Sequence, residues 1–72
     1  MNTQYLNNLA FVMDFLANKI SGGFTTSSNN DRLEISFNFN HSSYTIQLDK
    51  NGKSVRLNEK DICTYELINK FK

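Results

Sequence analysis

The chain has 72 residues, a formal net charge of +1 and a hydrophobic content of 39%. This length suits one small domain, the hydrophobic content excludes an intrinsically disordered chain, and the small charge excludes a general attraction to nucleic acid or anionic lipid. The chain has one cysteine, so it cannot form an internal disulfide. It shows no signal-peptide pattern and no apolar run long enough to cross a membrane, which predicts a cytoplasmic protein.

Residues 3–20 predict an amphipathic helix, because apolar residues recur along them with helical spacing. The predicted buried stripe contains Tyr5, Leu6, Leu9, Val12, Met13, Leu16 and Ile20. Phe11 and Phe15 fall nearly opposite this stripe and one helical turn apart, so they form one patch. Either the next segment folds back and Phe24 covers the two rings, or the rings anchor a partner. Exposed aromatic residues are typical interface anchors, which favours a docking site or a homodimer contact.

The segment that follows, residues 21–31, contains mainly small and polar residues, which predicts a flexible connector. Apolar and polar residues then alternate in three runs, which predict strands over residues 32–40, 43–49 and 53–57. The strands are separated by short polar segments, so we expect each to pair with the next as an antiparallel meander.

Two short turns fix the predicted register of this meander, one at His41–Ser42 and one at Asn51–Gly52. The expected cross-strand pairs are Phe39–Tyr44, Phe37–Ile46, Ile35–Leu48, Leu48–Val55 and Ile46–Leu57. Both turns bring apolar residues to the same face of the sheet, and the opposite face is polar. In this register Glu34 would lie opposite Asp49, a mildly unfavourable pair of like charges.

Residues 59–71 predict a second helix, with Asn58 as its N-cap and acidic residues in its first turn. The expected apolar stripe contains Ile62, Tyr65, Leu67, Ile68 and Phe71. The sequence therefore predicts one α+β domain over residues 1–72, in the order α-β-β-β-α. Both helices would cover one face of a three-stranded antiparallel sheet, and the other face would be open to solvent.

Residues with catalytic chemistry are few. His41 lies in a predicted turn beside serine residues, where turn formation is the usual role of such residues. Cys63 has no partner with the spacing of a metal site, and it is more often a small buried residue than a reactive thiol. The sequence thus predicts no enzyme activity, no metal site and no cofactor.

A group of basic residues marks a second candidate surface. Lys50, Lys53, Arg56 and Lys60 are expected around the second hairpin and the start of the last helix. Such residues could contact phosphates or an acidic patch on a protein, and lysines on a hairpin also prevent edge aggregation. The polar face of the sheet is either a third recognition surface or a solvated face.

The predicted element order resembles that of the double-stranded RNA-binding domain. His41 matches that family's histidine-containing loop, and Lys60 matches one position of its lysine cluster, where this chain has Glu59 and Asp61 beside it. The resemblance implies binding of duplex RNA through Lys53, Arg56 and Lys60. The acidic neighbours disfavour such direct nucleic-acid contact.

The size, the helix–meander–helix layout and a composition rich in residues with A/T-rich codons resemble small phage-encoded anti-defence proteins, anti-CRISPR proteins in particular. This resemblance implies a non-enzymatic inhibitor, in the host cytoplasm, that blocks a host protein or ribonucleoprotein complex sterically or allosterically. The expected partner-binding residues are Phe11, Phe15, Lys50, Lys53, Arg56 and Lys60. The alternatives are a divergent RNA-binding domain and a small regulatory homodimer through Phe11 and Phe15.

Overall fold

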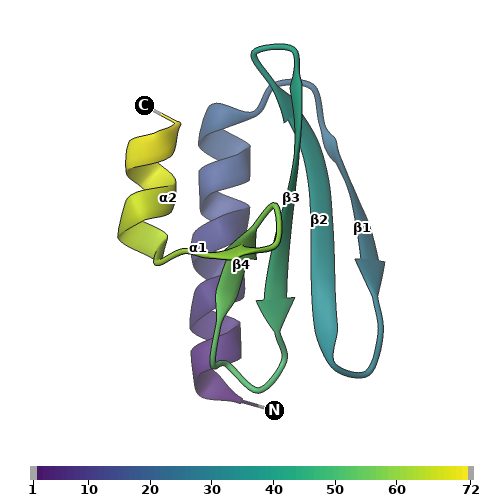
Figure 1. Ribbon diagram of the computed structural model, residues 1–72, viewed down its shortest axis with the longest axis vertical. Coiled ribbons are helices and arrows are strands. Elements are labelled where there is room, and N and C mark those ends of the chain that lie inside the picture. Colours follow the sequence, from purple (N-terminus) through teal and green to yellow (C-terminus); the bar gives the residue numbers. More distant parts are fainter. Residues whose placement is uncertain (1, 72) are drawn as a thin grey trace.

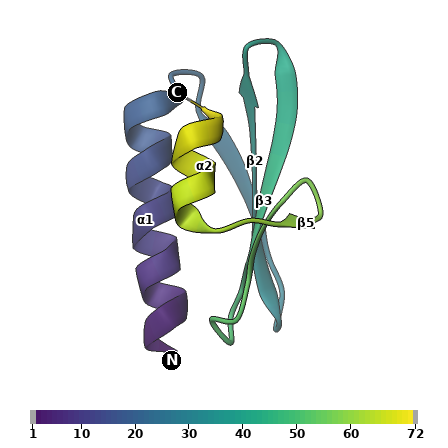
Figure 2. The same cartoon turned by 60° about the vertical axis from the view of Figure 1, so that its left-hand side comes forward.

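The computed structural model describes residues 2–71; Met1 and Lys72 lie outside the described residues. Its elements are α1 (Thr3–Lys19), β1 (Phe24–Ser28), β2 (Arg32–Phe39), β3 (Ser42–Asp49), β4 (Val55–Leu57), β5 (Lys60–Asp61) and α2 (Thr64–Lys70). All strand pairs are antiparallel, and the sheet order follows the chain from β1 to β5 (Figure 1). Both helices lie on one side of this open sheet (Figure 2), so the predicted α+β class is confirmed.

Two short strands extend the predicted meander at its edges. The segment 21–31, predicted to be a flexible connector, contains β1, which pairs along its whole length with β2. The turn between them is stabilised by Asn29, whose Oδ1 accepts hydrogen bonds from the backbone N–H groups of Asp31 and Arg32 at 2.8 and 2.9 Å. The prediction of a flexible connector over residues 21–31 was therefore wrong for Phe24–Ser28, because the Asn29 side chain forms a local turn that starts a hairpin.

The first residues of the predicted second helix form β5 instead. Asn58 and Glu59 have positive φ angles of 51° and 70°, which makes them a tight hairpin turn between β4 and β5. The Asn58 side chain accepts a hydrogen bond from the backbone N–H of Thr45 at 2.9 Å and does not cap a helix. The cap of α2 is Cys63, whose Sγ accepts from the backbone N–H of Glu66. The prediction of a helix over residues 59–71 was therefore wrong for residues 59–63, and the helix begins at Thr64.

The register between β3 and β4 is the predicted one, with Leu48 opposite Val55 and Ile46 opposite Leu57. The predicted register between β2 and β3 was wrong by two residues. The turn residues are Asn40 and His41, with φ angles of 51° and 67°. Asparagine adopts positive φ more readily than serine, so the turn forms one residue earlier than expected.

The two-residue shift leaves the apolar face unchanged, because side chains alternate between faces with a period of two. The observed apolar pairs between β2 and β3 are Leu33–Leu48, Ile35–Ile46 and Phe37–Tyr44. Glu34 lies opposite Gln47, whose Nε2 donates to Glu34 Oε1 at 3.1 Å. The expected like-charge pair of Glu34 and Asp49 does not occur, since Asp49 lies opposite Arg32.

The core lies between the sheet and the two helices, and Phe15 belongs to it. Phe15 is 6% exposed, and its ring centroid lies 6.2 Å from that of Phe37 and 5.3 Å from that of Phe71. The expectation that Phe15 faces solvent was wrong. Helix α1 is rotated about its axis so that Asn8 and Phe15 are buried while Leu6 and Met13 are 44% and 39% exposed.

Helix α2 holds Phe71 in the centre of an aromatic cluster. The Phe71 ring lies within 6 Å of four other rings, those of Phe15, Phe37, Phe39 and Tyr44. Leu67 is also buried, as expected, but Tyr65 is 72% exposed. The buried side of α2 is therefore narrower than the predicted stripe.

Candidate protein-interaction surfaces

The groove between α1 and α2 is the place where the predicted aromatic anchors lie. Phe11 is partly buried against the core, and a cavity of about 160 Å³ beside it is lined by Phe15, Asn18 and Ile68. Because Phe15 is buried and Phe11 is half covered, the two rings do not form an exposed patch. A homodimer contact through both rings is inconsistent with this packing.

The predicted basic group is divided between two turns. Lys50 and Lys53 lie in the hairpin between β3 and β4, whereas Lys60 lies at the β4–β5 turn, at the other end of β4. Lys50 Nζ donates to Ser28 Oγ at 2.8 Å and to the Asn29 carbonyl, so it fixes one hairpin to the next.

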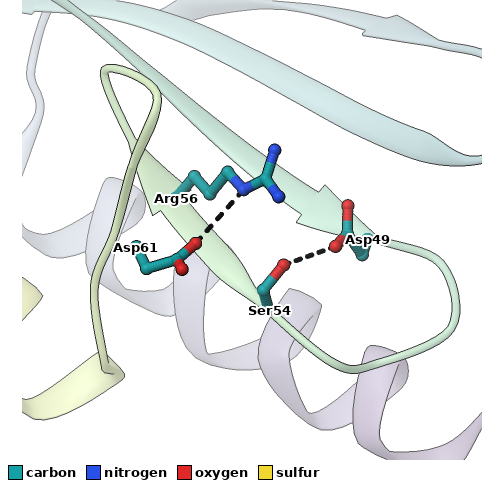
Figure 3. A network of polar contacts seen from close by, with 4 residues as sticks. All are labelled: Asp49, Ser54, Arg56 and Asp61. Carbon is teal, nitrogen blue, oxygen red and sulfur yellow. Dashed lines mark hydrogen bonds and ion pairs between the residues drawn. The ribbon is translucent and has the colours of Figure 1, made fainter.

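Arg56 projects from β4 toward Asp61 of β5, and its Nε donates to Asp61 Oδ1 at 3.2 Å (Figure 3). Ser54, the residue before β4, donates through its Oγ to Asp49 Oδ2. The Arg56 side chain thus forms an ion pair between two strands of the sheet. Lys53 and Lys60 are exposed, and their side chains stand at different ends of β4.

The polar face of the sheet is crossed by hydrogen bonds between neighbouring strands. Ser36 Oγ and Thr45 Oγ1 lie 3.3 Å apart, and Ser43 Oγ donates to Asn38 Oδ1 at 2.9 Å. Together with the bond between Glu34 and Gln47, these contacts pair the side chains of β2 with those of β3. A face whose polar groups bond to each other offers fewer free groups to a ligand, which favours the interpretation as a solvated face.

The edge formed by β1 differs from the rest of the sheet. All five residues of β1 are exposed, and within the described chain the strand pairs with β2 alone. Figure 1 shows β1 at the margin of the sheet, away from both helices. Phe24 and Thr26 share the face of Phe37 and Ile35, yet no helix covers them, and Phe24 is 39% exposed.

The opposite edge of the sheet is protected. Strand β5 has two residues, Lys60 and Asp61, and both carry a charge. Short length and charge are the usual means by which proteins prevent an edge strand from pairing with another chain. Strand β1, with the sequence FTTSS, has neither charge nor proline.

A second apolar surface lies on the outward side of α1. Leu6, Ala10, Met13 and Ala17 are all exposed, and they recur at alternating intervals of four and three residues. Helical-wheel reasoning assigned Leu6 and Met13 to the core, so this surface was missed. The signal that could have revealed it is the 4-3-4 spacing of large and small apolar residues.

Groups with catalytic or ligand chemistry lie apart from one another. His41 occupies an exposed turn, and Cys63 is exposed at the start of α2, where its Sγ–H donates to Glu66 Oε1 at 3.3 Å. Between residues 2 and 71 no group of three or more histidine, cysteine or acidic residues is placed to hold a metal ion. Neither helix in this part of the chain is long and apolar enough to cross a membrane.

Comparison of the chain with protein-family models, with curated proteins and with solved structures finds no match.

Proposed function

We propose that the protein is a non-enzymatic protein-binding module whose binding site is the free edge of β1. The observation that carries this proposal is a five-residue edge strand, Phe24–Ser28, that is exposed throughout and lacks charge and proline. The unpaired N–H and C=O groups of such an edge form a template for an extended segment of another protein.

The side chains of β1 indicate which segment would fit. Phe24 and Thr26 face the helix side of the sheet, whereas Thr25 and Ser27 face the polar side with Ser36 and Glu34. An added strand would therefore meet an aromatic ring on one face and hydroxyl groups on the other. A partner segment with alternating apolar and polar residues matches this edge, and main-chain hydrogen bonds would supply the affinity.

The size, the α+β layout and the A/T-biased composition support a finer form of the proposal. The partner is a protein or ribonucleoprotein complex of a bacterial defence system, such as a CRISPR effector, and binding blocks it sterically or holds it in an inactive conformation. Lys53 and Lys60, both exposed, would contribute to orientation at the rim of such an interface.

The alternative of duplex-RNA binding has less support. Its basic residues are dispersed, because Lys50 bonds to the β1–β2 turn and Arg56 pairs with Asp61. Helix α2 has an acidic residue, Glu66, in its first turn, and Lys60 lies outside the helix, on β5. A mobility shift with duplex RNA that weakens steeply with salt would favour this alternative.

The proposal is tested by adding charge to the edge. Thr25→Lys/Ser27→Lys places two lysines on β1, and Asn18→Lys/Asn69→Lys adds the same charge at exposed positions of the helices. We expect the wild-type protein, expressed in a bacterium with an active CRISPR system, to restore phage plating and to retain the effector complex on an affinity tag. The edge variant should lose both properties, and the helix variant should keep them.

If bacteria that contain the folded wild-type protein keep their full CRISPR defence against phage, the finer form of the proposal is overturned. Inhibition that survives in the edge variant would overturn the assignment of the binding site to β1. Circular dichroism of both variants shows whether they retain the fold.

A further inference from the structure

Helix α1 presents an apolar seam to solvent along its full length. The seam positions are Thr3, Leu6, Ala10, Met13, Ala17 and Ile20, at intervals of three and four residues. The first five are exposed and Ile20, the C-cap, is half-buried. None of the six carries a charge, and their spacing is that of the a and d positions of a coiled coil.

This seam is turned away from the rest of the molecule. The opposite side of α1 carries the buried residues Asn8, Val12 and Phe15, and one of its flanks meets α2 beside Phe11 and Ile68. Figure 2 shows α1 at the outside of the helical layer, with no other element over its outward side. A second helix could therefore approach the seam along the length of α1.

We propose that the occupant of the seam is α1 of a second copy of this chain, in antiparallel orientation. Large and small residues alternate along the seam, and an antiparallel pair sets each large residue of one helix against a small residue of the other. The layers are Leu6 on Ala17, Ala10 on Met13 and Thr3 on Ile20, each formed twice by the two-fold symmetry. A parallel pair would instead place Leu6 on Leu6 and Ala10 on Ala10, which alternates crowded layers with gaps.

The charges of α1 agree with the antiparallel pair. Asp14 flanks the seam, and in this register its nearest counterpart on the second copy is Asn7, an amide that can donate to a carboxylate. The two Asp14 side chains are offset by about 7 Å along the axis, whereas a parallel pair would set them side by side. Antiparallel packing also brings opposite ends of the helix dipoles together.

The extent of the seam determines how strong the dimer can be. A helix of 17 residues is roughly 25 Å long and roughly 10 Å wide, so each copy contributes a strip of roughly 250 Å². The pair then buries roughly 500 Å², less than the roughly 1,200 Å² at which specific, stable interfaces begin. We therefore expect a dimer that dissociates on dilution. Both β1 edges remain free in it, so this inference concerns a separate surface from the proposed binding site.

The first experiment uses Ala10→Glu, which introduces a carboxylate in the central layers of the seam. Asn18→Glu is a matched control, since it also places a glutamate four residues from Asp14 but outside the seam, beside the cavity at Phe11. Sedimentation from micromolar to millimolar concentration should give a dimer for the wild type and for the control. Ala10→Glu should raise the dissociation constant at least about 100-fold, because an unpaired buried charge is costly.

The second experiment tests the orientation in a Cys63→Ser background, where serine retains an N-cap for α2. Under oxidation, an equimolar mixture of Leu6→Cys and Ala17→Cys proteins should form the mixed disulfide. Leu6→Cys alone should not cross-link, because its two copies lie about 16 Å apart along the helix axis.

Three results would overturn the inference. They are a wild-type monomer at all concentrations, a dimer unaffected by Ala10→Glu, and self-cross-linking of Leu6→Cys. A dimer abolished by Thr25→Lys/Ser27→Lys but not by Ala10→Glu would assign the contact to β1 and so also exclude the seam. If Thr25→Lys/Ser27→Lys abolishes inhibition but leaves the dimer intact, the result concerns the proposed function of β1 and not the dimer.

Discussion

Gly52 shows how a single residue joins the sheet to the first helix. Its φ angle is +80°, and a Cβ at this position would lie 2.8 Å from Gln4 Cβ and nearer still to Asn2 Oδ1. Asn2 is the N-cap of α1, and its Oδ1 accepts from the backbone N–H of Tyr5 at 3.1 Å. The β3–β4 hairpin therefore rests against the start of α1 through a residue that has no side chain.

Replacing Gly52 by alanine should destabilise the protein. Positive φ is unfavourable for alanine, and the added methyl group must displace the cap of α1, so we expect a loss of about 1–3 kcal/mol in the free energy of unfolding. Urea titration followed by circular dichroism measures this change. Gly22→Ala is the control, since a Cβ there meets nothing within 4 Å. Equal stability of the two variants would contradict the proposed contact.

Of the strands longer than two residues, β1 is the one without a buried residue. It pairs with β2, and Lys50 bonds to its end at Ser28, but both of its faces and its outer edge are exposed. Strands β2 and β3, by contrast, carry core residues such as Ile35 and Ile46, which are fully buried. A strand with so little buried apolar surface can open without unfolding the rest of the sheet.

Amide hydrogen exchange should therefore separate β1 from the central strands. We expect the amides of residues 25–28 to exchange faster, by about 10-fold or more, than those of residues 35–37 and 46–48, because local opening of β1 costs less than global unfolding. Exchange measured by NMR at low protein concentration tests this. Equal protection of β1 and β3 would show that β1 belongs to the same cooperative unit as the core.

On the scale of the whole molecule, one layer of two helices covers a sheet of five strands incompletely. A chain of 72 residues buries only about 60% of the surface that its unfolded form exposes, so its own stability is small. Association through α1 would add apolar burial that the monomer lacks. The stability of the fold would then depend on protein concentration.

Thermal unfolding tests this link between association and stability. If the dimer forms through the seam, a hundredfold rise in protein concentration should raise Tm by roughly 4–8 °C. Ala10→Glu should show a Tm that does not change with concentration. A wild-type Tm independent of concentration would contradict a dimer that is coupled to folding.

The sequence alone determined what depends on neighbours along the chain. The alternation of apolar residues fixed the inner face of β2, β3 and β4, and Asn51–Gly52 fixed the register of β3 with β4. The turn lies at Asn40–His41, one residue earlier than predicted. The predicted apolar face was still correct, because the register changed by two residues and side chains alternate between faces with a period of two. The signals for β1 and β5 were also local, in the side-chain bonds of Asn29 and the turn at Asn58, and they were missed.

Only the tertiary structure decided which side of α1 is buried. A helical wheel chooses the most apolar arc, but the helix must also meet α2, and Phe15 is buried because Phe37 and Phe71 surround it. Both partners lie far from Phe15 in the sequence, so no local pattern reports the contact. The rotation that buries Phe15 exposes Leu6 and Met13, and it moves the candidate interface from the predicted aromatic pair to the outward seam of the same helix.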